Sequence, residues 1–259
     1  MRTRPPAQLT GPFRALPPGQ RAYGDFPRFG LPRFATRWPD AAPAILRVTG
    51  EVDQPLELLP ADLAALPRHE QTVDLHCVTT WTAVELRWEG VPFGDFYERV
   101  VVPRARPHPG CSYVVMTGLD GYRTSLPLED LLAADVLLAD HIDGKPLPAE
   151  HGAPLRLVAP SHYGYKSVKH LASIALRREA VPGLAGWKEH PRGRVALEER
   201  GQILPGWAYR WLLRAVLPAY AQWFRRRSAA SHPQRRPPGP PRGQPESTQA
   251  APGRPALRR

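Results

Sequence analysis

Cys77 is the residue of this chain whose type and surroundings most clearly could do chemistry. It lies in the run VDLHCVTTW at positions 73–81, whose alternating and β-branched residues predict a strand that ends at the cysteine or just before it. A thiolate is a soft anionic ligand for a metal centre. A lone cysteine among apolar neighbours is nevertheless more often an inert core residue. Taken alone, Cys77 leaves both interpretations open.

A second segment places cations in apolar surroundings. It reads EHGAPLRLVAP at positions 150–160 and continues as YGYKSVK at 163–169. Arg156 lies within an apolar run that predicts a strand, and a buried cation is costly without an anion beside it. We therefore expect Arg156 to have an anionic partner, with Lys169 as a second cation nearby. His151, taken alone, is better explained as a surface loop residue.

Together the two segments resemble the sulfite-oxidase-type molybdopterin oxidoreductases. The order of strand, Cys77, Trp81 and then RWEGV at 87–91 is similar to the cysteine segment of that family, and the resemblance spans residues 20–180. It implies an α+β chain with the sulfite oxidase fold in a single catalytic domain. It also implies molybdenum and molybdopterin as cofactors, and a two-electron oxo transfer on a small substrate such as an S-oxide or N-oxide.

The resemblance further implies roles for individual residues. Cys77 would be the molybdenum ligand, and Tyr122 would face the substrate, although on its own it is equally well a hairpin aromatic packing across strands. The implied pterin contacts are Gly24, Asp25, Phe26, Pro27, Asp120, His151, Arg156, Ser167, Val168 and Lys169. Cys111 follows a Pro-Gly turn and is assigned no role.

Two positions depart from the family's patterns in opposite directions. Thr82 stands where sulfite oxidases carry an arginine that helps to bind sulfite, and CVTTW at 77–81 instead resembles the bacterial methionine-sulfoxide-reductase catalytic subunits. His151 follows the sulfite-oxidase pattern, whereas those reductases have asparagine. The substrate and the direction of catalysis therefore stay open.

The elements that must position these residues mix strands with short helices. The absence of a regular strand–helix alternation favours an α+β class over a Rossmann arrangement, and no G-x-G-x-x-G or Walker A sequence supports a nucleotide site. Asp143-Gly144 predicts a tight turn. The predicted strands are 44–50, 71–77, 85–89, 112–116, 121–126, 136–141, 155–159 and 171–176. The predicted helices are 60–66, 93–101 and 128–133.

Four parts follow one another along the chain. Residues 1–40 predict an arm that packs on the core, and 41–195 predict the molybdopterin-binding oxidoreductase domain. Residues 196–227 form an extension in which 207–227 predicts an amphipathic helix, packed on the body or a partner or lying on a membrane surface. Two arginines and a proline argue against a membrane span there. The Pro/Arg-rich tail 228–259 predicts disorder.

The net charge of +11 suggests nucleic acid as a partner, but the charge is local. Eight arginines and Glu246 lie between Arg226 and the end, so this stretch carries +7 and the body only +4. We therefore expect no specific nucleic-acid partner. One alternative is a non-catalytic basic protein whose tail binds nucleic acid or anionic membrane, and another is a family scaffold that has lost its metal.

Two cysteines exclude a disulfide framework, and no zinc or haem spacing is present. Residues 1–20 lack the apolar run of a signal peptide and a twin-arginine pair, which predicts a cytoplasmic protein. The chain shows neither the haem domain nor the C-terminal dimerisation domain of the family. This predicts an external electron-transfer partner and a monomer.

Overall fold

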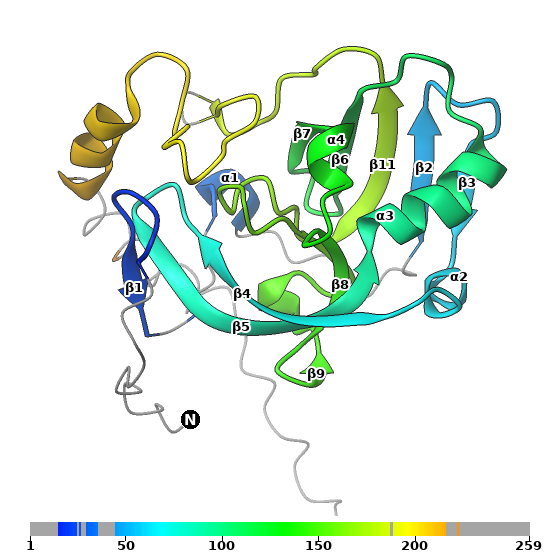
Figure 1. Cartoon of the computed structure of the whole chain (residues 1–259), viewed down its shortest axis with the longest axis horizontal. Helices are drawn as coiled ribbons and strands as arrows, with labels where there is room; N and C mark the ends of the chain where they lie inside the picture. Colours follow the sequence, from blue (N-terminus) through cyan, green and yellow to red (C-terminus); the bar gives the residue numbers. More distant parts are fainter. Residues whose placement is uncertain are drawn as a thin grey trace, which may run out of the picture.

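Two β-sheets build the computed structural model, which describes residues 15–24, 26, 30–35, 45–186, 189–215 and 222. A long curved hairpin of the first sheet runs along the bottom of the view in Figure 1. The strands of the second sheet stand above it on the right. This mixture of sheets and short helices confirms the predicted α+β class.

The first sheet has the order β1-β5-β8-β10, with β4 paired to β5 and β9 to β8. Only β1 runs parallel to its neighbour, so the arm residues that form it join the sheet beside β5. The β8–β9 hairpin closes through the predicted turn, where Asp143 and Gly144 both have positive φ. The strands of this sheet are β1 (Arg21–Tyr23), β4 (His69–His76), β5 (Trp81–Pro92), β8 (Leu137–Ile142), β9 (Lys145–Pro146) and β10 (Arg156–Val158).

The second sheet has the order β3-β2-β11-β6-β7, with β2 and β11 parallel and the other pairs antiparallel. Its central strand β11 is thus the last strand in sequence, and it lies between β2 and β6. The strands of this sheet are β2 (Leu46–Gly50), β3 (Leu56–Leu58), β6 (Tyr113–Gly118), β7 (Arg123–Pro127) and β11 (Leu171–Arg177).

The helices are short, as the high proline content leads one to expect. α2 begins at Pro60, and because proline has no backbone N–H, the first turn has one fewer donor without an acceptor. Asp62 accepts the Leu59 N–H at 2.8 Å. The helical elements are α1 (Pro32–Ala35), α2 (Pro60–Ala64), α3 (Phe93–Phe96), the π-helical η1 (Tyr97–Ala105), α4 (Leu128–Leu131) and the 3₁₀ turn η2 (Ala149–His151). Residues 206–215 are also helical.

The main core joins residues of both sheets and of α3. Inward-facing residues of β2, β6 and β11, such as Val48, Met116 and Ile174, are fully or almost fully buried there. Phe93 and Phe96 of α3 and Leu157 of β10 pack into the same cluster. A second cluster around Trp88 lies on the first sheet. The segment that holds Arg156 is therefore fixed between two apolar clusters.

The predicted strands and helices all have counterparts in the structure, although β5 extends well beyond the predicted 85–89. Five short elements were not predicted: β1, β3, β9, α1 and η2. A three-residue strand such as β1 has too little periodicity of its own, and it forms because β5 supplies its hydrogen bonds. The tail 228–259 lies outside the described residues.

Candidate functional site

Cys77 lies in the four-residue turn between β4 and β5. Its backbone N–H donates to the Trp81 carbonyl at 2.8 Å, and the Thr80 N–H donates to the Cys77 carbonyl at 3.1 Å. Thr80 has φ +78°, a left-handed conformation that is strained for a β-branched residue. The Cys77 Sγ lies 3.0 Å from the Thr79 hydroxyl oxygen. The turn therefore holds the thiol at the end of a rigid hairpin, as the strand pattern predicted.

Residues from distant parts of the chain hold this turn in place. The Gln20 side-chain amide donates to the Cys77 carbonyl at 3.1 Å, and the Arg21 N–H donates to the Thr80 carbonyl at 3.1 Å. Arg200, which is fully buried, donates to the Val78 carbonyl at 2.6 Å. These contacts compensate for the strain at Thr80 and fix the position of the thiol.

We expect Arg200→Met to destabilise the protein by about 2–3 kcal/mol, because the carbonyls of Val78 and Pro18 lose a charged donor. The measurement is the free energy of urea unfolding. As a control, Arg47→Met removes an exposed arginine paired with Glu57 and should cost less than about 1 kcal/mol. Equal losses in the two variants would contradict a bracing role for Arg200.

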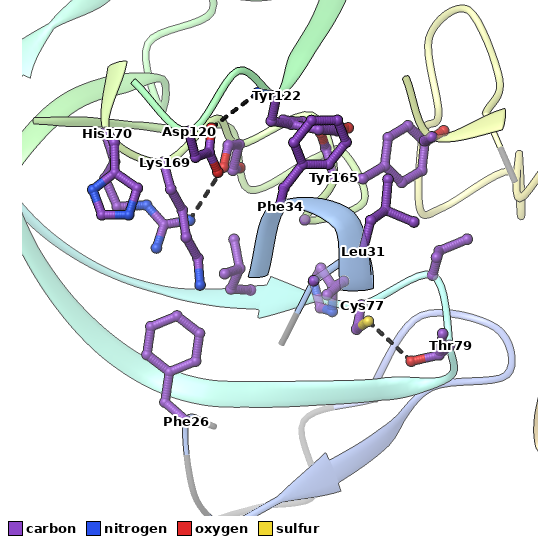
Figure 2. A pocket seen from close by; sticks show the side chains of 18 of the residues that line it. Phe26, Leu31, Phe34, Cys77, Thr79, Asp120, Tyr122, Tyr165, Lys169 and His170 are labelled. Carbon is purple, nitrogen blue, oxygen red and sulfur yellow. Dashed lines mark hydrogen bonds between the residues drawn. The ribbon is translucent and has the colours of Figure 1, made fainter. Parts of the chain in front are cut away.

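The Cys77 turn opens into a cavity of about 150 Å³ between the two sheets' loops and α1. Figure 2 shows Lys169 and His170 at one end of this cavity and Cys77 with Thr79 at the other. Beside Cys77 the lining includes the polar side chains of His76 and Thr79, and Phe26 lies at the end of Lys169 and His170. The lining residues include Phe26, Leu31, Phe34, Leu75, Cys77, Val78, Trp81, Asp120, Tyr122, Arg156, Tyr165, Ser167, Lys169, His170 and Ala185.

Arg156 is a cation buried to 1% exposure on this cavity. Its guanidinium donates to the carbonyls of His151, Leu157 and Ser167 at 2.8, 3.3 and 3.4 Å and lies 4.9 Å from the Trp88 ring centroid. Burial lowers the pKa of Arg156 to about 9, so it is charged at neutral pH. Among the described residues no carboxylate pairs with it.

This arrangement leaves Arg156 able to bind an anion. A guanidinium has five N–H donors, and three of them are used in the bonds to backbone carbonyls, which leaves two. Within the described part of the chain, its positive charge is uncompensated at the wall of a cavity. The anionic partner expected from the sequence is therefore not a side chain described here, and a bound anionic group fits the position.

Other predicted pterin contacts surround the same end of the cavity. The Lys169 ammonium donates to the Glu150 carbonyl at 3.1 Å, and the His151 ring stacks on Phe26 with centroids 4.2 Å apart. The Ser167 hydroxyl accepts the Ala159 N–H at 3.1 Å, so this side chain shapes the loop. Asp120 accepts the Tyr122 N–H at 2.9 Å and thereby closes the turn before β7.

Four further predicted contacts lie apart from the cavity lining or outside the described residues. The Val168 side chain is buried in the main core. Its backbone carbonyl accepts the Leu157 N–H at 2.9 Å, so Val168 positions β10. Gly24 is exposed and does not line the cavity. Asp25 and Pro27 lie outside the described residues.

Tyr122 lines the cavity, and its hydroxyl donates to the Tyr165 carbonyl at 2.7 Å. Burial raises the pKa of Tyr122 well above its usual value, so the phenol stays neutral. Its ring meets Phe34 edge-on with centroids 5.4 Å apart. A substrate group that approaches Tyr122 would therefore meet a phenol oxygen able to accept, with its proton held by Tyr165.

Sequence reasoning missed several residues at this site. His170, buried beside Lys169, has a ring nitrogen 2.6 Å from the Ala153 carbonyl and lines the polar end. Trp88 supplies the face on which Arg156 lies, and Tyr165 lines the cavity beside Tyr122. His170 follows directly after the predicted YGYKSVK segment, so its ring chemistry and position were an available signal. Arg200 had no such signal.

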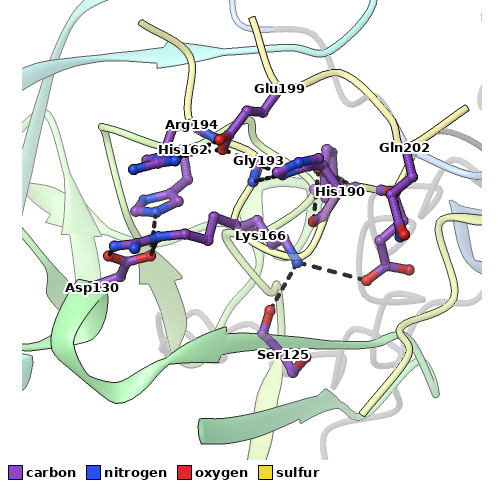
Figure 3. A network of polar contacts seen from close by, with 12 residues as sticks. Ser125, Asp130, His162, Lys166, His190, Gly193, Arg194, Glu199 and Gln202 are labelled. Atoms are coloured by element: carbon purple, nitrogen blue, oxygen red, sulfur yellow. Dashed lines mark hydrogen bonds and ion pairs between the residues drawn. The ribbon is translucent and has the colours of Figure 1, made fainter. Parts of the chain in front are cut away.

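A polar network lies behind the cavity and is drawn in Figure 3. The fully buried Lys166 donates to the Ser125 carbonyl at 2.8 Å and to the Thr124 hydroxyl at 3.2 Å, and it lies 3.6 Å from the Glu189 carboxylate. Nearby, His162 and Arg192 both contact Asp130. These bonds tie the segment that follows β11 to the second sheet.

We expect the stability contributed by Lys166 to rise with pH. Burial lowers its pKa to about 8, although Glu189 acts in the opposite direction. Below pH 8 the lysine is charged in both folded and unfolded chains, so the folded state bears the full desolvation penalty. Between about pH 8 and 10.5 only the unfolded chain keeps the proton, and wild type should gain stability relative to Lys166→Met.

Urea unfolding of both proteins across that pH range measures this difference. Lys145→Met serves as a control, because Lys145 is exposed on β9. If the difference in unfolding free energy between wild type and Lys166→Met stays constant or falls as the pH rises, the proposed lowered pKa of Lys166 is contradicted.

The sequence of this chain matches a protein-family model and several known proteins. The family model described as "Oxidoreductase molybdopterin binding domain" matches residues 36–185. The chain is 37% identical over 186 residues to "Uncharacterized oxidoreductase YuiH" of Bacillus subtilis (strain 168), which covers 69% of this chain and 87% of that protein. It is 32% identical over 194 residues to the "Protein-methionine-sulfoxide reductase catalytic subunit MsrP" of Xanthomonas campestris pv. campestris.

The match to MsrP covers 65% of this chain and 58% of MsrP, so the chain spans less than two thirds of that relative. The MsrP of Xanthomonas axonopodis pv. citri matches to the same extent. Among solved structures, the sulfane dehydrogenase SoxCD from Paracoccus pantotrophus matches with a TM-score of 0.46 and 26% identity. That match covers 53% of this chain and 39% of the SoxCD chain.

Proposed function

We propose, from the premise that this chain belongs to the family of oxidoreductases with a molybdopterin binding domain and is a molybdenum oxidoreductase, that its substrate is a neutral S-oxide or N-oxide. The observation that carries the proposal is the polarity of the cavity. Arg156, which no carboxylate of the described residues compensates, lines the cavity with Lys169, whereas side chains without a formal charge, such as Leu31 and Thr79, lie near the Cys77 thiol.

The residues present fit molybdopterin-bound molybdenum. Two N–H groups of Arg156 have no acceptor among the described residues, and Lys169 and His170 lie at the same end, where a pterin phosphate would bind. The Cys77 thiol, held by the hairpin turn, would be the protein ligand of the metal. When bound, the cofactor supplies a metal that exchanges an oxygen atom and two electrons with the substrate.

The protein's part in the reaction is to bind and orient the substrate. Reduction of a sulfoxide to a thioether and water takes up two electrons and two protons, and oxidation of a thioether is the reverse. The electrons would come from an external one-electron carrier. Leu31 and Phe34 would offer the substrate apolar surface, and the Tyr122 ring, fixed by the hydrogen bond from its hydroxyl to the Tyr165 carbonyl, would limit the orientations that the substrate can adopt.

The lining of the cysteine end favours a neutral substrate over an oxyanion such as sulfite. Leu31, Phe34 and Trp81 provide apolar surface there. Thr82, at the position where the sulfite oxidases have arginine, is fully buried. Its hydroxyl bonds to Gln20 and lies 2.9 Å from a ring nitrogen of His76, so this position contributes no charge to the cavity. A sulfite dianion would have to give up its hydration there without a cation from this position.

The test is to express the protein in a host that makes the cofactor, to measure molybdenum and pterin, and to compare two assays. With a reduced dye as electron donor, we expect reduction of dimethyl sulfoxide and of methionine sulfoxide. With an oxidised dye as acceptor, we expect little sulfite oxidation. Preferential sulfite oxidation would overturn the substrate class, and a folded protein without molybdenum or pterin would overturn the proposed function.

The partner and the location belong to the same proposal. We expect a monomeric enzyme in the cytoplasm that uses an external electron carrier. Cell fractionation with activity staining tests the location, and recovery of the enzyme in the periplasmic fraction would contradict it. Among the described residues, no helix is long and apolar enough to cross a bilayer.

A further inference from the structure

The helix at residues 206–215 has one face on the body and one face in solvent. It is the orange helix at the left of Figure 1. Tyr209 and Leu213, four residues apart, are each 1% exposed and pack against a cluster that includes Val78, the neighbour of Cys77. The packing that the sequence predicted as one option is therefore present, and it uses only this face.

The opposite face carries large apolar side chains into solvent. Trp207 and Trp211, also four residues apart, are 59% and 68% exposed, and Ile203 just before the helix is 76% exposed. With Leu204 and Leu212 they form what we call the tryptophan face. Five of the eleven exposed large apolar residues in the described part of the chain lie in this stretch of ten positions. Such clustering marks an interaction surface.

Cations gather beside the tryptophan face. Arg210 pairs with Glu198 at 3.4 Å, and Arg214 donates to the Gly19 carbonyl at 3.3 Å. Burial, and then the positive charges of Arg21, Arg210 and Arg200, lower the pKa of Arg214, whereas Glu198 acts in the opposite direction; Arg200 is itself buried, so Arg21, Arg210 and Arg214 are the cations that lie at the surface here. The sequence continues this charge with three consecutive arginines at 225–227.

We propose that the tryptophan face and its neighbouring arginines bind the surface of an anionic phospholipid bilayer. Exposed tryptophans on a short amphipathic helix insert at the boundary between headgroups and acyl chains, and arginines beside them attract anionic headgroups. Each basic residue near such a surface adds about 1 kcal/mol of attraction. The charge complementarity thus favours lipid over a second copy of this chain, whose corresponding surface carries the same positive charge.

Docking would give the site a fixed relation to the membrane. The buried face of the helix contacts the cluster that contains Val78, so the cysteine turn lies on the far side of one helix from the bilayer. That separation is about 10 Å, the diameter of a helix. An electron carrier confined to the membrane surface would then reach the same side of the protein. The lipid binding itself does not depend on the proposed reaction.

The test is flotation of the full-length holoenzyme with vesicles of phosphatidylcholine, with and without phosphatidylglycerol. We expect binding to the vesicles that contain phosphatidylglycerol and about tenfold weaker binding for the double variant Trp207→Gln/Trp211→Gln. A matched control, Leu59→Gln/Leu132→Gln, removes two exposed leucines elsewhere and should bind as wild type does. Melting temperature and molybdenum content show whether each variant is folded and loaded.

Three outcomes would overturn the proposal. The wild type fails to float with either vesicle, or the tryptophan variant floats as well as the wild type, which would assign binding to the arginine-rich tail alone. In the third, sedimentation shows a dimer that the tryptophan substitutions dissociate while vesicles bind nothing, which would assign the face to a second copy. Because flotation is read without an activity assay, these outcomes are distinct from failure of the proposed function.

Discussion

Cys77→Ser is expected to lower the molybdenum-dependent activity by roughly three orders of magnitude or more. The serine hydroxyl is a harder ligand than a thiolate and keeps its proton at neutral pH, so it cannot replace the Cys77 sulfur. The turn should keep its shape, because its bonds use the backbone of Cys77 and the hydroxyl has a neighbour at Thr79. Steady-state assays of the loaded enzyme, with metal analysis, measure the effect.

Cys111→Ser is the matched control. Cys111 lies in the loop after η1, where its thiol donates to the Glu51 carbonyl at 3.5 Å and burial raises its pKa. It does not line the cavity. We expect the activity and the absorption spectrum of Cys111→Ser to equal those of the wild type. The part of the charge-transfer absorption that a cysteine sulfur would contribute should be missing from Cys77→Ser alone. A Cys77→Ser variant that kept the wild-type absorption and activity would show that Cys77 has only a packing role.

The parts of the candidate site that depend on a local sequence pattern could be predicted. Cys77 ends a strand pattern, and Arg156 interrupts an apolar strand, so the location of each could be predicted without knowledge of the fold. Their presence on one cavity followed from the family resemblance, which local pattern could not replace. Val168 shows the limit of that transfer, because its side chain lies in the core while its neighbours Ser167 and Lys169 line the cavity.

The residues that brace the cysteine turn could not be predicted, for a physical reason. Gln20 and Arg200 reach the turn from positions 57 and 122 residues away in the sequence. Each is recognisable only by the carbonyl that it contacts, and a sequence does not say which carbonyl of a strained turn lacks a partner. The same holds for β1, whose three residues acquire strand geometry from pairing with β5.

Arg156→Met is expected to separate cofactor retention from folding. In a host that makes the cofactor, the purified variant should hold at least about tenfold less pterin and molybdenum, because the anion loses a buried, charged donor. In a host that lacks the cofactor, its free energy of unfolding should lie within about 1 kcal/mol of the wild type. Metal and pterin analysis measures the first quantity, and urea unfolding the second.

The near-equality without cofactor follows from two opposing effects. Methionine removes the hydrogen bonds to the carbonyls of His151, Leu157 and Ser167, which costs stability. It also removes a buried charge that no carboxylate of the described residues compensates, and it leaves an apolar side chain of similar length against Trp88. Arg156→Lys keeps the charge but offers fewer donors in a different geometry, so it should retain an intermediate amount of pterin.

A purely structural arginine would behave differently in both hosts. If the three carbonyl bonds were the reason for its burial, Arg156→Met would be destabilised to the same extent with and without cofactor, and Arg156→Lys would restore stability in proportion to the bonds that it makes. The cavity geometry predicts instead that Arg156→Met is less stable than the wild type only in the host that makes the cofactor. Wild type should therefore gain stability on loading while Arg156→Met gains little, since a ligand stabilises only the folded state that binds it.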